Sequence, residues 1–94
     1  MEKLLSFICA ELDCYLDEIR SNCRGKISKK RKILILVLIY CGYSLSEISK
    51  AIFKDISSIN YAHKSASLED KQTAFLIISR YNKWKKYVDN QNFS

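Results

Sequence analysis

Apolar residues recur along the chain at helical spacing, with charged residues between them. The first stretch of this kind ends near Asp13, and its apolar positions are Leu4, Leu5, Ile8 and Leu12. A second, shorter stretch covers residues 15–19. Because positions three and four apart lie on one face of an α-helix, each stretch predicts an amphipathic helix with one face in a core.

A third helix is predicted from an unbroken apolar run of nine residues, 33–41. Nine residues are too few to cross a bilayer, which takes about 20, so we expect this run inside a protein core. We expect Ser28 to cap the helix, which would then run from about Lys29 to Tyr40. Gly42 can end it, since glycine adopts the left-handed conformation at low cost.

Two short helices with a tight turn between them are predicted next. Ser44 and Glu47 have the spacing of a capping box at the start of the first helix. Asp55 can cap the second helix, and the inner positions of that helix are Ile59, Ala62 and Ala66. This arrangement is typical of a helix-turn-helix. The second helix would then expose Ser58, Tyr61 and Lys64, with Ile56 and Ser57 at its N-terminal tip.

A last helix is predicted from Leu68 or Glu69 to Val88, with Trp84 as a core anchor and a frayed tail from about residue 89 to 94. With no proline and two glycines, the chain lacks the turn residues that a small β-sandwich or barrel requires. The pattern therefore predicts one all-α domain over residues 1–94, a compact bundle of about five to six helices that contains the helix-turn-helix.

Positive charge gathers in one segment. The chain has a net charge of +6, and residues 20–32 hold seven basic residues and no acidic one, whereas residues 1–19 have a net charge of −4. A basic segment is typical of a polyanion partner, either nucleic acid or an acidic membrane surface. It is equally typical of a solvated loop and helix start.

The sequence shows no pattern typical of a metal site, a cofactor site or an enzyme active site. The four cysteines form no CxxC pair and His63 is the single histidine, so no metal site is expected. Two isolated glycines cannot make a phosphate-binding loop, and no cofactor is expected. No nucleophile, base and orienting group stand in a recognisable set, so we do not expect an enzyme. His63 is expected to pack or to face solvent.

The order of these segments resembles the C-terminal DNA-binding domain (domain IV) of the bacterial replication initiator DnaA, here standing alone. The resemblance covers roughly residues 4–88 and implies a Trp-repressor-like helix-turn-helix fold. It rests on the basic segment 24–32, on the sequence LSEISKAI over residues 45–52, and on KDISSINYA over residues 54–62. The chain departs from the family where a Gly-Gly pair is replaced and the turn shortened, and where Ile56 and Tyr61 stand in place of two histidines.

The resemblance implies a double-stranded DNA partner and assigns roles to single residues. Arg24 aligns with a loop arginine that enters the minor groove, and Lys54 and Asp55 hold the places of an Arg-Asp pair. Ser57 and Ser58 would meet base edges or phosphates. The predicted DNA-binding residues are Arg24, Lys26, Lys29, Lys30, Lys32, Lys54, Asp55, Ile56, Ser57, Ser58, Tyr61 and Lys64.

The implied function is sequence-specific binding of double-stranded DNA by a monomer in the bacterial cytoplasm, at the nucleoid, in replication initiation or its regulation. Three uses stay open. The chain could be a stand-alone factor that competes for initiator sites or regulates transcription, or a domain of a longer protein. It could also be a protein-interaction or anionic-membrane-surface module, bound to acidic phospholipid, that kept the fold and lost specific DNA readout.

Overall fold

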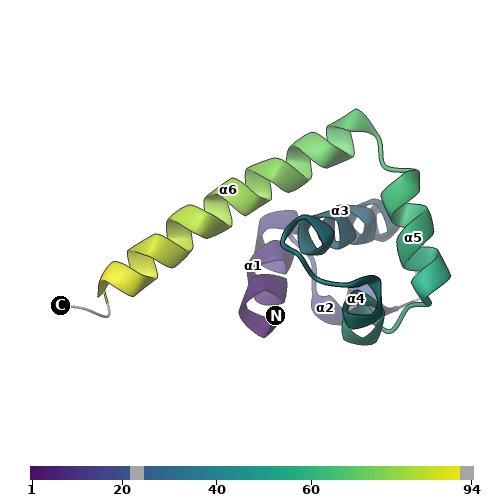
Figure 1. Cartoon of the computed structure of the whole chain (residues 1–94), viewed down its shortest axis with the longest axis horizontal. Coiled ribbons are helices and arrows are strands. Elements are labelled where there is room, and N and C mark those ends of the chain that lie inside the picture. The colour runs from purple at the N-terminus through teal and green to yellow at the C-terminus, as the bar shows by residue number, and fades with distance from the viewer. Residues whose placement is uncertain (22–24, 92–94) are drawn as a thin grey trace.

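The computed structural model describes residues 1–21 and 25–91, and within them every regular element is an α-helix. In chain order these are α1 (Glu2–Leu12), α2 (Leu16–Arg20), α3 (Lys26–Tyr40), α4 (Leu45–Ile52), α5 (Ile56–Lys64) and α6 (Leu68–Gln91) (Figure 1). The predicted all-α bundle is therefore confirmed. Across this part of the chain, no helix combines the length and the apolar content that a bilayer span requires.

Helix α3 forms the centre of the bundle. It packs against each of the other five described helices, and its residues 33–38 are buried one after another. A helix that is apolar on all sides is stable only when it is surrounded by other elements. The other helices supply the rest of the core, which includes Leu4, Ile8, Ile19, Ile48, Ile52, Ile59, Ala74 and Ile77.

Several helix ends follow the predicted local chemistry. Helix α1 stops at Asp13, which adopts the left-handed conformation with φ of 54°. Gly42 follows α3 with φ of 97°, as predicted for a glycine that ends a helix. The capping box of α4 is present: the Glu47 amide donates to Ser44 Oγ at 3.1 Å, and Glu47 Oε1 accepts from the Ser44 amide at 3.4 Å.

Other helix ends differ from the prediction. Helix α3 begins at Lys26 because Gly25, with φ of 81°, occupies the N-cap position, so Ser28 lies inside the first turn and does not cap the helix. Asp55 holds the N-cap position of α5, but its side chain makes no cap hydrogen bond. Helix α6 continues to Gln91, beyond the predicted end at Val88, since no proline or glycine follows to stop it. The rest of the predicted frayed tail, residues 92–94, lies outside the described residues.

The long helix α6 gives the molecule its elongated shape, 44 × 25 × 24 Å. It packs on α3 and, farther along, on α1, and its C-terminal end projects past the bundle away from α5 (Figure 1). The predicted role of Trp84 as a core anchor is therefore wrong. The side chain remains 40% exposed, and its ring contacts are with Phe7 and Tyr81, 5.5 and 5.8 Å away between centroids.

Candidate nucleic-acid interface

Helices α4 and α5 are short, consecutive and joined by residues 53–55, at the place predicted for a helix-turn-helix. They pack against each other and against α3. Ile48 and Ile52 of α4 and Ile59 and Ala62 of α5 are buried. One side of α5 is thereby fixed to the core, and its opposite side is left facing outward.

The outward side of α5 carries a stripe of polar side chains. Ser57, Tyr61 and Lys64 are spaced four and three residues apart, so they share one helical face, and all three are exposed. Tyr61 exposes 71% of its surface. Ile56 and Ser58 flank this stripe at the N-terminal end of α5 and are also exposed. The residues predicted to read DNA therefore lie at the surface.

A cleft of about 1000 Å³ separates the start of α3 from the α4–α5 turn and α5. We call it the α3–α5 cleft. Its α3 wall consists of Gly25, Ser28, Arg31, Lys32 and Ile35. Its other wall consists of Phe53, Lys54, Asp55, Ser58, Ile59, Tyr61 and Ala62. The cleft thus joins part of the basic segment to part of the predicted recognition helix, although the two are far apart in sequence.

The cations of the cleft are positioned by the end of α2. Arg31 donates from Nε to the Ile19 carbonyl at 2.7 Å and from Nη2 to the Ser21 carbonyl at 2.8 Å. Lys54 donates from Nζ to the same Ser21 carbonyl at 2.6 Å. Carbonyl groups at a helix C-terminus attract cations. These bonds therefore hold two positive charges, one from each wall, at one edge of the cleft.

The remaining lysines of the basic segment point in different directions. Lys32 is partly buried and lines the cleft, and Lys26 is exposed at the start of α3. Lys30 lies on the opposite side of α3, where its Nζ donates to the Asp13 carbonyl at 3.0 Å. Lys30 is therefore not grouped with the other predicted contacts. Arg24, the predicted minor-groove residue, lies outside the described residues.

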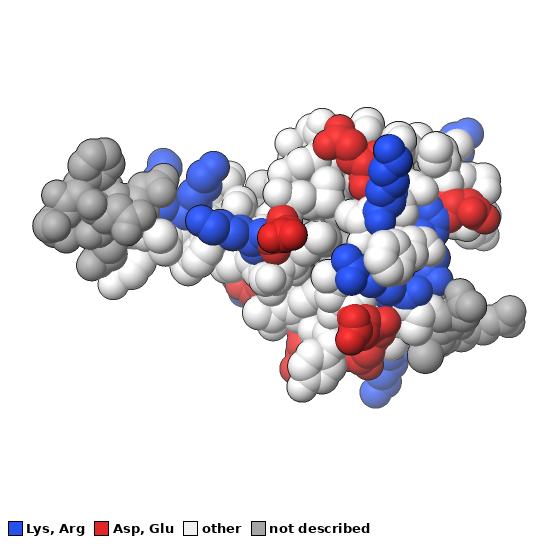
Figure 2. Space-filling model, turned by 90° about the horizontal axis from the view of Figure 1, so that it is seen from below, with Lys and Arg blue, Asp and Glu red and all other residues white. Residues whose placement is uncertain are grey.

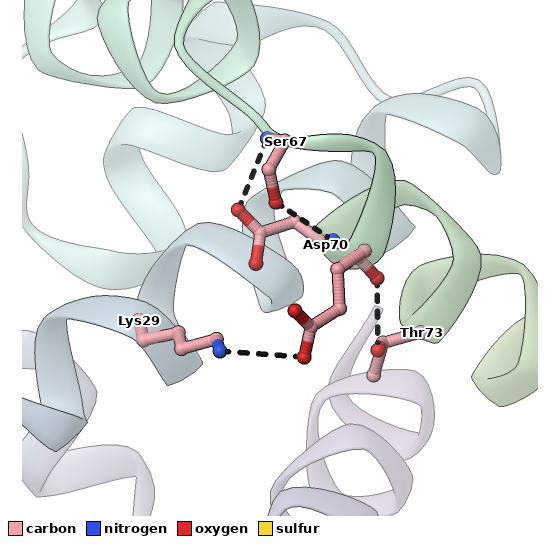
Figure 3. A network of polar contacts seen from close by, with 5 residues as sticks. Lys29, Ser67, Asp70 and Thr73 are labelled. Carbon is pink, nitrogen blue, oxygen red and sulfur yellow. Dashed lines mark hydrogen bonds and ion pairs between the residues drawn. The ribbon is translucent and has the colours of Figure 1, made fainter.

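Lys29 faces the start of α6 and not the cleft. Its Nζ lies 3.7 Å from Glu69 Oε1, an exposed ion pair that links α3 to α6 (Figure 3). Beside it, Ser67 and Asp70 form a capping box: the Ser67 amide donates to Asp70 Oδ2 at 3.2 Å, and the Asp70 amide donates to Ser67 Oγ at 3.1 Å. The Ser-x-x-Asp spacing of these residues is a local sequence signal for the start of α6 that was not among the predicted features.

Phe53 is a surface residue that is not among the predicted DNA-binding residues. It ends α4 in the left-handed conformation, with φ of 57°, and it exposes 67% of its surface. The guanidinium carbon of Arg20 lies 4.4 Å from its ring centroid. The signal for it in the sequence is an aromatic residue in the short turn between two helices.

Basic side chains gather in two places on the face shown in Figure 2. One group lies on the bundle with acidic side chains around it, and the other lies on the projecting part of α6.

Within the described part of the chain, no group of three or more histidine, cysteine or acidic side chains could hold a metal ion. Burial, together with the neighbouring Cys14, raises the pKa of the Cys9 thiol to about 12, which keeps it protonated and unreactive.

Comparisons with known proteins add no further information: no family model, no curated protein and no solved structure matches this chain. The candidate interface therefore depends on the geometry of the α3–α5 cleft and of the exposed stripe on α5.

Proposed function

We propose that the protein binds double-stranded DNA, with α5 in the major groove and the basic segment along the sugar-phosphate backbone. The observation that carries this proposal is the α3–α5 cleft, which sets a cationic wall beside an exposed, polar helix face. Phosphate contacts supply affinity and fix orientation, while side chains at base edges supply specificity. A helix and an adjacent basic wall provide both kinds of contact from one side of the molecule.

The dimensions of α5 suit a major groove. An α-helix with its side chains is about 10–12 Å across, which fits a B-DNA major groove about 12 Å wide. The nine residues of α5 give about 13 Å of helix to lie along the groove. Ser57 and Tyr61 carry hydroxyl groups that can donate to or accept from base edges. Lys64, on the same face, can neutralise a phosphate or donate to guanine.

Asp55 and Ile56 support base recognition at the tip of α5. The Asp55 side chain is exposed and makes no cap hydrogen bond, so its carboxylate can accept from the amino group of cytosine or adenine. Ile56 is 49% exposed, which is unfavourable in water, and it offers a surface for a thymine methyl group. Both features favour sequence-specific binding over purely electrostatic binding.

A role in replication initiation or its regulation, and binding as a monomer at the nucleoid, are part of this proposal and rest on the resemblance to the initiator domain alone. Enrichment from a pool of random duplexes tests the specificity directly. We expect a shared short motif among the selected duplexes. Recovery of unrelated sequences would leave only non-specific binding.

Charge reversal on α5 tests the docking face. Ser57→Glu places a negative charge on the exposed stripe, and we expect at least about a tenfold loss of affinity for duplex DNA, since the carboxylate would face phosphates and base edges. The matched control is Ser79→Glu, the same change of net charge at an exposed position of α6. Equal losses in the two variants, with helicity intact by circular dichroism, would contradict the proposed face. Stronger retention on anionic vesicles than on duplex DNA at matched salt would favour a membrane-surface function instead.

A further inference from the structure

Phe53 adopts a backbone conformation that its side chain makes costly. Its φ of 57° and ψ of 44° lie in the left-handed region, where the Cβ atom of an L-residue crowds the following carbonyl oxygen. Asp13 adopts nearly the same conformation at the end of α1, with φ of 54°. Aspartate tolerates this conformation, because its short polar side chain can bond to the local backbone. Phenylalanine has no such compensation.

Folding alone gives a weak reason for phenylalanine at this position. The ring covers the guanidinium of Arg20, at 4.4 Å from its centroid, and Arg20 is already tied to α4 by its Nε–H, which donates to the Ala51 carbonyl at 3.0 Å. The remaining two thirds of the Phe53 surface is exposed to solvent. Glycine or asparagine would end α4 with less strain and without this apolar exposure.

The exposed ring belongs to the α3–α5 cleft. Phe53 lines it together with Lys32 on the opposite wall and Tyr61 on α5. A strand of DNA offers phosphates to cations and the apolar faces of its deoxyriboses to aromatic rings. A cleft with an aromatic ring beside fixed positive charges is complementary to both parts of such a strand.

We propose that Phe53 is a DNA-binding residue whose open ring face packs on the deoxyribose of the strand that lies along the cationic wall of the cleft. Its left-handed backbone is then retained for binding and not for stability, as backbone outliers often are at functional sites. Arg20 acts as a positioning residue, because it holds the opposite face of the ring. This inference rests on the proposed binding of duplex DNA.

The test separates binding from folding. Phe53→Asn removes the ring and keeps a residue that accepts the left-handed conformation, so we expect a Tm equal to or above that of the wild-type chain. Affinity for duplex DNA at fixed salt should fall about fivefold or more, because apolar contact with the sugar is lost. The dependence of affinity on salt should stay unchanged, since the ring neutralises no phosphate. Phe53→Tyr keeps the ring and should restore the affinity.

The control is Tyr87→Asn, which removes a ring of similar exposure, 64%, near the C-terminal end of α6. We expect wild-type affinity from it. If Phe53→Asn fails to fold, Phe53→Gly carries the same test. Unchanged DNA affinity in the folded variant would overturn the inference and leave the proposed function intact. Failure of the wild-type chain to bind duplex DNA at any salt concentration would remove both.

Discussion

Two lysines on α3 provide a sharp test of the proposed interface. Lys32 lines the α3–α5 cleft, whereas Lys30 lies on the other side of the helix and donates to the Asp13 carbonyl. The two lysines are two positions apart, with one residue between them, which places them on opposite faces of an α-helix. Lys30→Gln and Lys32→Gln therefore make the same change of net charge at different places.

Counterion release sets the expected loss of DNA affinity with rising salt. Four of the predicted cationic contacts, Lys26, Lys29, Lys32 and Lys64, are described residues, and a fifth, Arg24, lies outside the described residues. With five phosphate contacts, raising the salt from about 50 to about 200 mM should weaken binding about 500-fold. With four, as expected for Lys32→Gln, the loss should be about 150-fold, because each contact contributes about 0.9 to the logarithmic slope.

Fluorescence anisotropy of a labelled duplex, titrated at several salt concentrations, measures these slopes. Lys32→Gln should give a shallower slope than the wild-type chain, and Lys30→Gln should give the wild-type slope. Circular dichroism should show intact helices in both variants, since each lysine contributes little to folding. Equal slopes for the two variants would refute the reasoning, because the geometry of α3 would then have no influence on binding.

Three further predictions concern the fold itself. Burial raises the pKa of the Cys9 thiol from its ordinary value of 9.0 to about 12 in the folded chain. Its contribution to stability is therefore present below pH 9 and is lost as the pH rises toward 12. The stability of the wild-type chain relative to Cys9→Ala should fall by roughly 1 kcal/mol between pH 8 and pH 10 in denaturant titrations. Ser44→Ala removes the capping box of α4 and should lower the free energy of unfolding by about 1 kcal/mol, and an unchanged value would show that the box contributes nothing. Ile59→Ala opens a cavity at a fully buried position of α5 and should cost about 2–5 kcal/mol, whereas a cost below about 1 kcal/mol would mean that α5 is not anchored to the core.

The sequence predicted those features whose cause is local. The apolar run over residues 33–41 contains six consecutive buried positions of α3, because a helix that is apolar on all sides has one stable place in a bundle. The capping box at Ser44 and the turn at Gly42 were also predictable, since their chemistry involves residues within four positions of each other.

Features that depend on distant parts of the chain were not predictable in the same way. The bond from Lys54 to the Ser21 carbonyl joins residues 33 positions apart, and no local pattern marks it. Trp84 belongs to a regular apolar stripe, yet the projection of α6 past the bundle leaves it partly exposed. Helical spacing places Lys30 and Lys32 on opposite faces, but only the packing of α3 shows that Lys32 is the one that lines the α3–α5 cleft.

Two unfavourable local choices lie at or next to the α3–α5 cleft. The first turn of α3 holds no acidic residue and begins with Lys26, so its cations oppose the helix dipole. Phe53, on the other wall, holds the left-handed conformation at a steric cost. Elsewhere, as at the Ser44 and Ser67 capping boxes, local sequence and fold agree. Disagreement between local preference and fold is expected at functional sites. If one ligand accounts for both choices, relieving either should stabilise the chain and weaken its binding to duplex DNA.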